Sequence, residues 1–138
     1  MKLTVLTSDA AQADGSGKVN ALGMGWSMVG TPLPAHAVIM LFHIDWHESN
    51  EKHTFVLELL DEDGNAVSIG NENGAALVRV EGQFEQGRPP GIVKGTPLVQ
   101  PVVIQLPPGM PLPGGKRYEY RVTVGDKEGV AAFAVLAP

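Results

Sequence analysis

Apolar residues recur at every second position along several short runs of this chain, and the strongest run covers residues 35–46. Successive side chains of a strand point to opposite faces, so one face of this run is apolar from residue 38 to residue 46. That face carries five side chains: Val38, Met40, Phe42, Ile44 and Trp46. Ile39 and Leu41 make the opposite face apolar too, which predicts a central position in a sheet or burial on both sides.

Residues 116–138 predict a hairpin in which inward apolar or aromatic residues alternate with outward polar ones. The inward positions are Tyr118, Tyr120, Val122 and Val124, and the outward positions are Arg117, Glu119, Arg121 and Thr123. A slip of one residue would expose the whole apolar set, so the alternation fixes the register of the hairpin. Further runs bring the expected total to about eight or nine strands. These runs cover residues 2–7, 19–28, 53–60, 65–69, 75–84 and 99–106.

Glycine and proline separate the runs, with turns expected at residues 14–17, 63–64, 71–74 and 125–129. Short alternating strands between turns are typical of an all-β fold, and no segment shows the period of an amphipathic helix. We therefore predict an antiparallel two-sheet β-sandwich of immunoglobulin-like or jelly-roll-like type. Tyr118 follows a proline–glycine turn near the start of a strand, as in the tyrosine corner of immunoglobulin-like sandwiches; the alternative is an ordinary buried tyrosine at a strand start, and the Cys-Trp-Cys core of true immunoglobulin domains is absent.

Residues 87–114 differ in composition from the rest of the chain and contain most of its prolines. Proline cannot donate a ladder hydrogen bond and occurs at sheet edges and in loops. We expect a long, stiff connection here, with one edge strand at residues 99–106. Too little chain follows for a second core, so residues 1–138 are expected to form a single domain.

Charge and composition narrow the possible functions. The formal net charge of −5 disfavours a nucleic-acid partner, which needs clustered lysine and arginine. The chain has no cysteine, which excludes disulfides and thiolate metal sites. No signal peptide or membrane-length apolar run is visible, so we expect a cytoplasmic protein without membrane contact. Charged residues make up 18% and apolar residues 43%, which leaves a poorly covered surface and favours a homo-oligomer.

The opening segment, KLTVLTSDAAQADGSGKVNALGMGWSMVG, resembles that of a family of small uncharacterised β-rich proteins found mainly in actinobacteria. Trp46, Asn50, His53 and the segment FVLELLDEDGNAV are similar as well, so the resemblance covers most of residues 2–66. It implies a compact β domain. The family has no assigned activity, so the resemblance supplies no catalytic residue.

The segment His43-Ile44-Asp45-Trp46-His47 is the sharpest candidate for chemistry. On a strand, His43, Asp45 and His47 share a face, and two imidazoles with a carboxylate suit Zn²⁺ or Fe²⁺. His53 or Glu48 would complete the ligand set. The alternative is a solvated strand end, because strands become polar where they enter loops. A short helix overlapping residues 46–53 would also separate the three side chains.

Two tryptophans offer a second kind of site. Exposed indole rings of Trp26 and Trp46 would stack on sugars or anchor a partner. Each ends an apolar alternation, however, which favours burial in the sandwich. No Gly-x-Ser-x-Gly elbow is present, and residues 15–18 lack the spacing of a phosphate loop, so no catalytic residue or cofactor is predicted.

Three functions follow in order of support. The absence of a reactive constellation and the low charge favour a non-catalytic interaction module that self-associates. A metal-dependent enzyme built on His43, Asp45 and His47 is the first alternative. A carbohydrate-binding module that uses Trp26 or Trp46 is the second.

Overall fold

The computed structural model describes residues 1–71 and 74–138, and this part of the chain is all-β. Its twelve strands are β1 (Lys2–Ser8), β2 (Ala10–Ala13), β3 (Val19–Leu22), β4 (Met28–Val29), β5 (His36–Ile44), β6 (Lys52–Asp61), β7 (Ser68–Asn71), β8 (Gly74–Leu77), β9 (Arg79–Glu85), β10 (Leu98–Leu106), β11 (Lys116–Val124) and β12 (Lys127–Val135). One short 3₁₀ helix, η1, covers Trp46–Glu48. No helix in the described ranges has the length and apolar character that crossing a bilayer requires.

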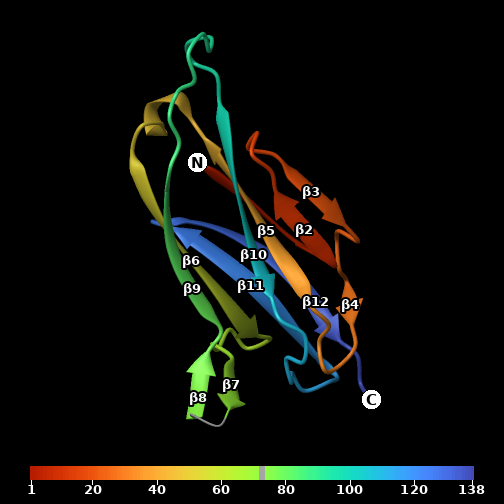
Figure 1. The fold of residues 1–138 in the computed structure, drawn as a ribbon. Coiled ribbons are helices and arrows are strands. Elements are labelled where there is room, and N and C mark those ends of the chain that lie inside the picture. Colours follow the sequence, from red (N-terminus) through yellow and green to blue (C-terminus); the bar gives the residue numbers. More distant parts are fainter. Residues whose placement is uncertain (72–73) are drawn as a thin grey trace.

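The strands of the described residues form two larger sheets and two ribbons (Figure 1). The three-stranded sheet has the order β1-β5-β10, and the five-stranded sheet has the order β4-β12-β11-β6-β9. The ribbons are the hairpins β2-β3 and β7-β8. The central position predicted for β5 is confirmed, because β1 and β10 both pair with it in antiparallel register. The edge position predicted for residues 99–106 is confirmed as well.

The inner faces of the two larger sheets share one hydrophobic core. The five-stranded sheet contributes Phe55, Leu57, Leu59, Tyr118, Tyr120, Val122, Phe133 and Val135, and β5 contributes Val38, Met40, Phe42 and Ile44. The four core residues of β5 are at most 1% exposed. The proline-rich connection adds Met110 and Leu112, and Met110 forms an isolated bridge with Leu33. Alternation therefore identified the core positions of β5 and β11 correctly.

The single strand expected at residues 19–28 is wrong. The chain forms β3, leaves the extended conformation and pairs again only at β4. Gly23 and Gly25 have φ of 62° and 87°, a left-handed conformation that strands do not tolerate. The segment after β1, which was not expected to be a strand, instead forms β2 and pairs with β3.

Two other predicted runs have different limits. Residues 75–84 divide into β8 and β9, and Val78 lies between them, donating to Val67 and accepting from Leu59 through its backbone. The strand expected at residues 35–46 ends at Ile44, because Asp45 opens η1. Of the turn expected at residues 71–74, residues 72 and 73 lie outside the described residues.

The tyrosine corner expected at Tyr118 has its characteristic hydrogen bond. The Tyr118 hydroxyl donates to the backbone carbonyl of Pro113 at 3.1 Å, across the turn that leads into β11. Burial raises the pKa of Tyr118, and the carboxylates of Asp61 and Glu62 raise it further. The hydroxyl therefore stays protonated and remains a donor at neutral pH.

Gly82 on the edge strand β9 lies opposite the buried ring of Phe55 on β6. A Cβ at Gly82 would lie 2.6 Å from the ring, so the ring occupies the space that a side chain would need. We predict that Gly82→Ala lowers the free energy of unfolding by about 1–3 kcal/mol, because Phe55 must leave its packed position. Urea denaturation measures this.

The matched control is Gly30→Ala. Gly30 has no heavy atom within 4 Å of the added Cβ and its φ is not positive. Its effect should stay within about 0.5 kcal/mol. If the two variants lower the free energy of unfolding equally, the packing of Phe55 does not require a glycine at position 82.

Candidate functional site

The outer face of the three-stranded sheet is apolar along its centre. The register places Leu6 opposite Ile39 and Ile39 opposite Val103, which makes one row across all three strands. The next row contains Thr4, Leu41 and Pro101. A sheet face that meets water normally carries polar side chains, so these rows indicate a surface that needs a cover.

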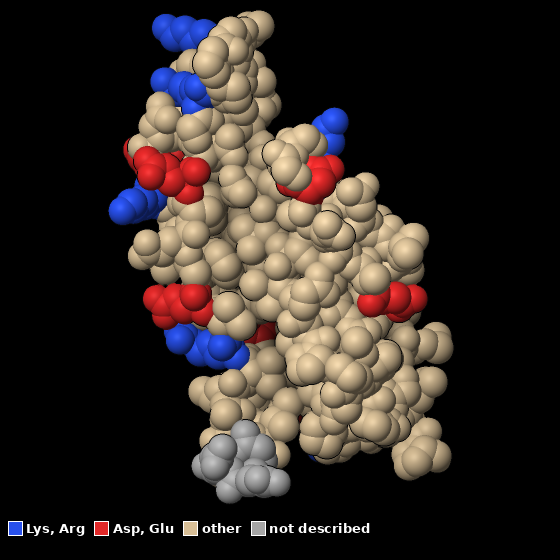
Figure 2. Space-filling view, viewed as in Figure 1, with Lys and Arg blue, Asp and Glu red and all other residues tan. Residues whose placement is uncertain are grey.

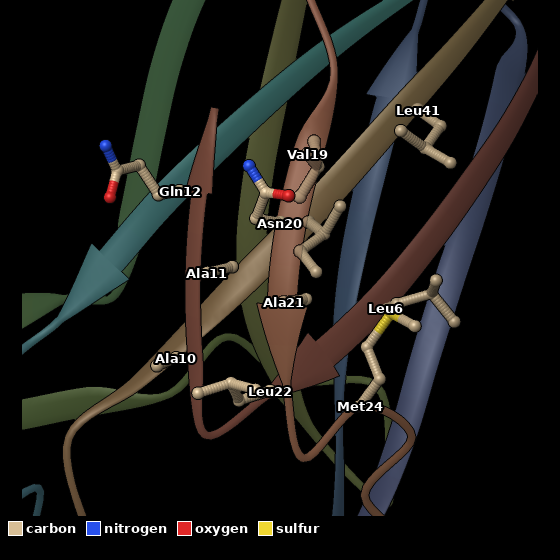
Figure 3. Close-up of a pocket in the computed structure, with 11 residues that line it drawn as sticks. Leu6, Ala10, Ala11, Gln12, Val19, Asn20, Ala21, Leu22, Met24 and Leu41 are labelled. Atoms are coloured by element: carbon tan, nitrogen blue, oxygen red, sulfur yellow. The ribbon is translucent and has the colours of Figure 1, made fainter. Parts of the chain in front are cut away.

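The ribbon β2-β3 covers part of this face and leaves a groove beside it. Ala11 of β2 packs on Ala37 and Ile39, and the Gln105 side chain donates to the Ala11 carbonyl. Between ribbon and sheet lies a groove of about 890 Å³ (Figure 3). Its lining residues are Leu6, Ala10, Ala11, Gln12, Val19, Asn20, Ala21, Leu22, Met24, Ile39 and Leu41. The only polar side chains among them are two amides, so the groove offers hydrogen bonds but no charge.

Two large apolar side chains stand exposed at one end of the groove. Leu22 is 74% exposed and Met24 is 57% exposed. Gly23 lies between them, and a Cβ there would overlap the carboxylate of Asp9. That carboxylate accepts a hydrogen bond of 2.9 Å from the indole N–H of Trp26. The Asp9–Trp26 bond therefore ties down the segment that carries Met24.

Charged residues border the groove without lining it: Asp9 lies beside Gly23, and Lys2 lies on the outer face of β1. Figure 2 shows a broad uncharged area over β5, β10 and the ribbon β2-β3, with lysine, arginine and carboxylates toward its margins. The outer face of the five-stranded sheet differs, because Arg121 pairs there with Glu119 and Glu128, and Arg79 pairs with Glu81. The two outer faces of the molecule are thus chemically unlike.

Trp26 is half-buried and covers a polar pair inside the core. Its ring centroid lies 4.7 Å from that of His36, which is 2% exposed. His36 Nδ1 must donate to the Pro34 carbonyl at 2.9 Å, because that oxygen only accepts. Nε2 is then unprotonated and accepts from the Tyr120 hydroxyl at 2.7 Å. Burial lowers the pKa of His36 and raises that of Tyr120, so both groups stay neutral.

Trp46 lies in η1 and is held by Arg88. The guanidinium carbon of Arg88 lies 4.0 Å above the indole centroid. The same guanidinium donates to the Trp46 carbonyl at 2.7 Å and to the Ser49 hydroxyl at 2.6 Å. Arg88 therefore fastens the proline-rich connection to the turn after β5 and covers one face of this indole.

The candidate metal ligands do not all meet. The ligand atoms of Asp45, His47 and Glu48 lie within 4.8 Å of one another, while His43 is outside this group. His43 stays on β5, where its Nε2 lies 3.0 Å from the Thr4 hydroxyl. His53, the other expected ligand, has its Nε2 2.9 Å from the backbone carbonyl of Glu48.

The carboxylates of this group already have partners. The N-terminal ammonium lies 3.1 Å from Glu48 and 3.7 Å from Asp45, and Glu48 accepts the Asp45 N–H at 3.0 Å. Burial raises the pKa of Glu48, but this hydrogen bond and the ammonium outweigh it, so the net pKa is lowered. These contacts stabilise η1, and a metal cation would compete with the N-terminal ammonium for the carboxylates of Asp45 and Glu48.

A model of a protein family matches residues 3–133, nearly the whole chain. The chain belongs to the Family of unknown function (DUF6941). The expected membership of an uncharacterised family is thereby confirmed. A comparison with curated proteins finds no match to this member of the family.

Sequence reasoning missed the groove of this DUF6941 member. The signal available was the double-sided apolar pattern of β5, since Ile39 and Leu41 predicted burial on the outer face. Ala10 to Ala13 alternate too weakly to identify the ribbon that covers this face only in part. The groove could be predicted only if β2 had first been predicted as a strand.

The His36–Tyr120 pair predicts that acid destabilises this family member. The unfolded histidine takes up a proton near pH 6.5, whereas the folded one does so at lower pH. Between these values the unfolded chain binds more protons, so the free energy of unfolding falls as pH decreases below about 6.5. The slope due to this group is at most about 1.4 kcal/mol per pH unit. Urea titrations between pH 5.5 and 8 measure it.

Two variants separate this slope from other titrations. His36→Gln should remove it, and His47→Gln, at an exposed position, should keep it. An unchanged slope in His36→Gln would assign the acid sensitivity to another group.

Arg88 predicts a measurable restraint on Trp46. In a Trp26→Phe background, Arg88→Ala should increase acrylamide quenching of the remaining indole and lower the free energy of unfolding by about 1 kcal/mol. Arg79→Ala is the control, because its ion pair with Glu81 is exposed and should contribute little. Unchanged quenching after removal of Arg88 would show that the cation–π contact does not hold the ring.

Proposed function

We propose that this DUF6941 member is a non-catalytic interaction module that self-associates. The observation that carries the proposal is the groove on the outer face of the three-stranded sheet, whose lining has no charged side chain. Apolar surface on a soluble domain favours association, since burial contributes about 25 cal/mol per Å² removed from water. Most of the groove lining consists of aliphatic side chains, which suits contact with another apolar surface.

Charge supports association of like with like. The chain carries a net charge of −5, so two copies repel each other wherever carboxylates would meet. The groove and its lining contribute no charged side chain to such an encounter. A contact through this face therefore avoids the repulsion that contacts elsewhere would meet.

The proposal includes an architecture and a location. We assign the three- and five-stranded sheets to an immunoglobulin-like β-sandwich, supported by their shared core and the Tyr118–Pro113 hydrogen bond. The absence of cysteine means that folding needs no oxidising compartment, which supports a cytoplasmic homo-oligomer.

The two alternatives have less support. A metal-dependent enzyme would use Asp45 and His47, but His43 does not join them and the N-terminal ammonium already lies beside the carboxylates of Asp45 and Glu48. A carbohydrate-binding module would need a free indole face. Trp26 lies against His36, and Arg88 covers one face of Trp46.

Sedimentation velocity over a concentration series tests the proposal. We expect reversible association, with a mass above the 14.6 kDa of one chain at the higher concentrations. Weak salt dependence should accompany it, because the contact is apolar. Weak complexes have dissociation constants up to about 1 mM, so the series extends to about that concentration. Self-association would be contradicted if the protein still sediments with the mass of one chain there.

A further inference from the structure

We propose that two copies pair face to face about a two-fold axis perpendicular to the groove, with Leu22 and Met24 of each copy seated against Leu41 of the other. This inference rests on the self-association proposed above and specifies its surface and geometry. The occupant of the groove is therefore a second copy of this chain.

Charge is the first reason to choose a second copy placed face to face. The occupant must be apolar and uncharged over the length of the groove. The outer face of the five-stranded sheet is not suitable, since Glu58, Arg121 and Arg79 are cross-strand neighbours on it. Burying such charges without matched partners costs several kcal/mol. The groove lining of another copy brings no charged side chain, and the nearby carboxylate of Asp9 is already bonded to the indole N–H of Trp26.

Shape is the second reason. Figure 3 shows Leu22 and Met24 at one end of the groove and Leu41 toward the other. A two-fold axis perpendicular to the groove reverses this direction, so the exposed end of one copy comes over the hollow end of its partner. The same contact then forms twice, and both pairs of exposed side chains leave water.

Size sets the expected strength. A stable interface takes about 800 Å² from each partner, roughly a tenth of a small protein's surface. The accessible surface of this chain is 7872 Å², so an interface of that size is about a tenth of it. The sheet of three strands has a footprint of only roughly 14 by 30 Å, to which the ribbon adds its edge. We therefore expect a dissociation constant in the micromolar range, about 1–100 μM.

Crosslinking tests the geometry directly, because the natural chain contains no cysteine. Met24→Cys and Leu41→Cys are made as separate variants, mixed in equal amounts and treated with a short bismaleimide. The mixture should give a covalent dimer in much higher yield than either variant alone. Val93→Cys mixed with Val130→Cys is the control, since both residues are exposed and remote from the groove lining.

Charge substitutions test the energetics without threatening the fold. Leu22→Glu and Met24→Glu change side chains that are already exposed, and each should raise the dissociation constant about 100-fold or more. Val130→Glu is the matched control and should leave it within about three-fold, because Val130 is 49% exposed on the opposite face. Circular dichroism verifies that every variant remains folded.

The outcomes separate the two proposals. Natural chain that stays monomeric would overturn both self-association and this pairing. Natural chain that associates, while the Glu variants still associate and the 24–41 crosslink is absent, would overturn the pairing alone. Native mass spectrometry tests whether a small apolar ligand occupies the groove instead. A monomer carrying a bound apolar molecule would overturn the pairing.

Discussion

Strand β5 is apolar on both faces, and the organisation of the molecule depends on burying both of them. Its even-numbered side chains from Val38 to Ile44 are at most 1% exposed and join the core shared with the five-stranded sheet. Ala37, Ile39 and Leu41 point the other way, toward the ribbon β2-β3 in the part of the chain that the structure describes. The ribbon β2-β3 buries Ile39, but Leu41 remains half-buried at the groove. The groove is therefore a consequence of incomplete cover over one strand.

Much of the fold could be predicted from alternation, because register follows directly from it. The central place of β5, the edge place of β10 and the β11-β12 hairpin are all confirmed. Prediction was wrong where local backbone conformation overrides hydrophobicity. Gly23 and Gly25 end β3 through positive φ values, and the apolar residues Met24 and Met28 around them resemble a continuing strand. The pattern of apolar residues does not report φ, so it predicts one continuous strand where the backbone turns.

The candidate site was less predictable, because it depends on where chain segments turn. The proposed ligands His43, Asp45 and His47 share a face only while the strand continues, and η1 begins directly after Asp45. Trp46 leaves the core face for the same reason, and Arg88, forty-two residues away in sequence, holds it. The groove combines residues of β1, β2, β3 and β5. No local motif encodes such a combination, although the apolar outer face of β5 indicated that some cover was needed.

The sheet edges explain why association through the groove would stop at a pair. Unpaired edge strands permit open-ended addition of further copies, and proteins block them with proline, charge or short strands. Here β10 carries Pro101, β9 carries Arg79, Glu81 and Glu85, and β4 has only two residues. The contacts between β1 and β12 close the fourth side, where Gly129 lies against Leu3 and Val5. In the described residues the five-stranded sheet has a charged outer face, so the proposed contact uses the groove on the three-stranded sheet, and a two-fold arrangement would bury that groove in both copies at once.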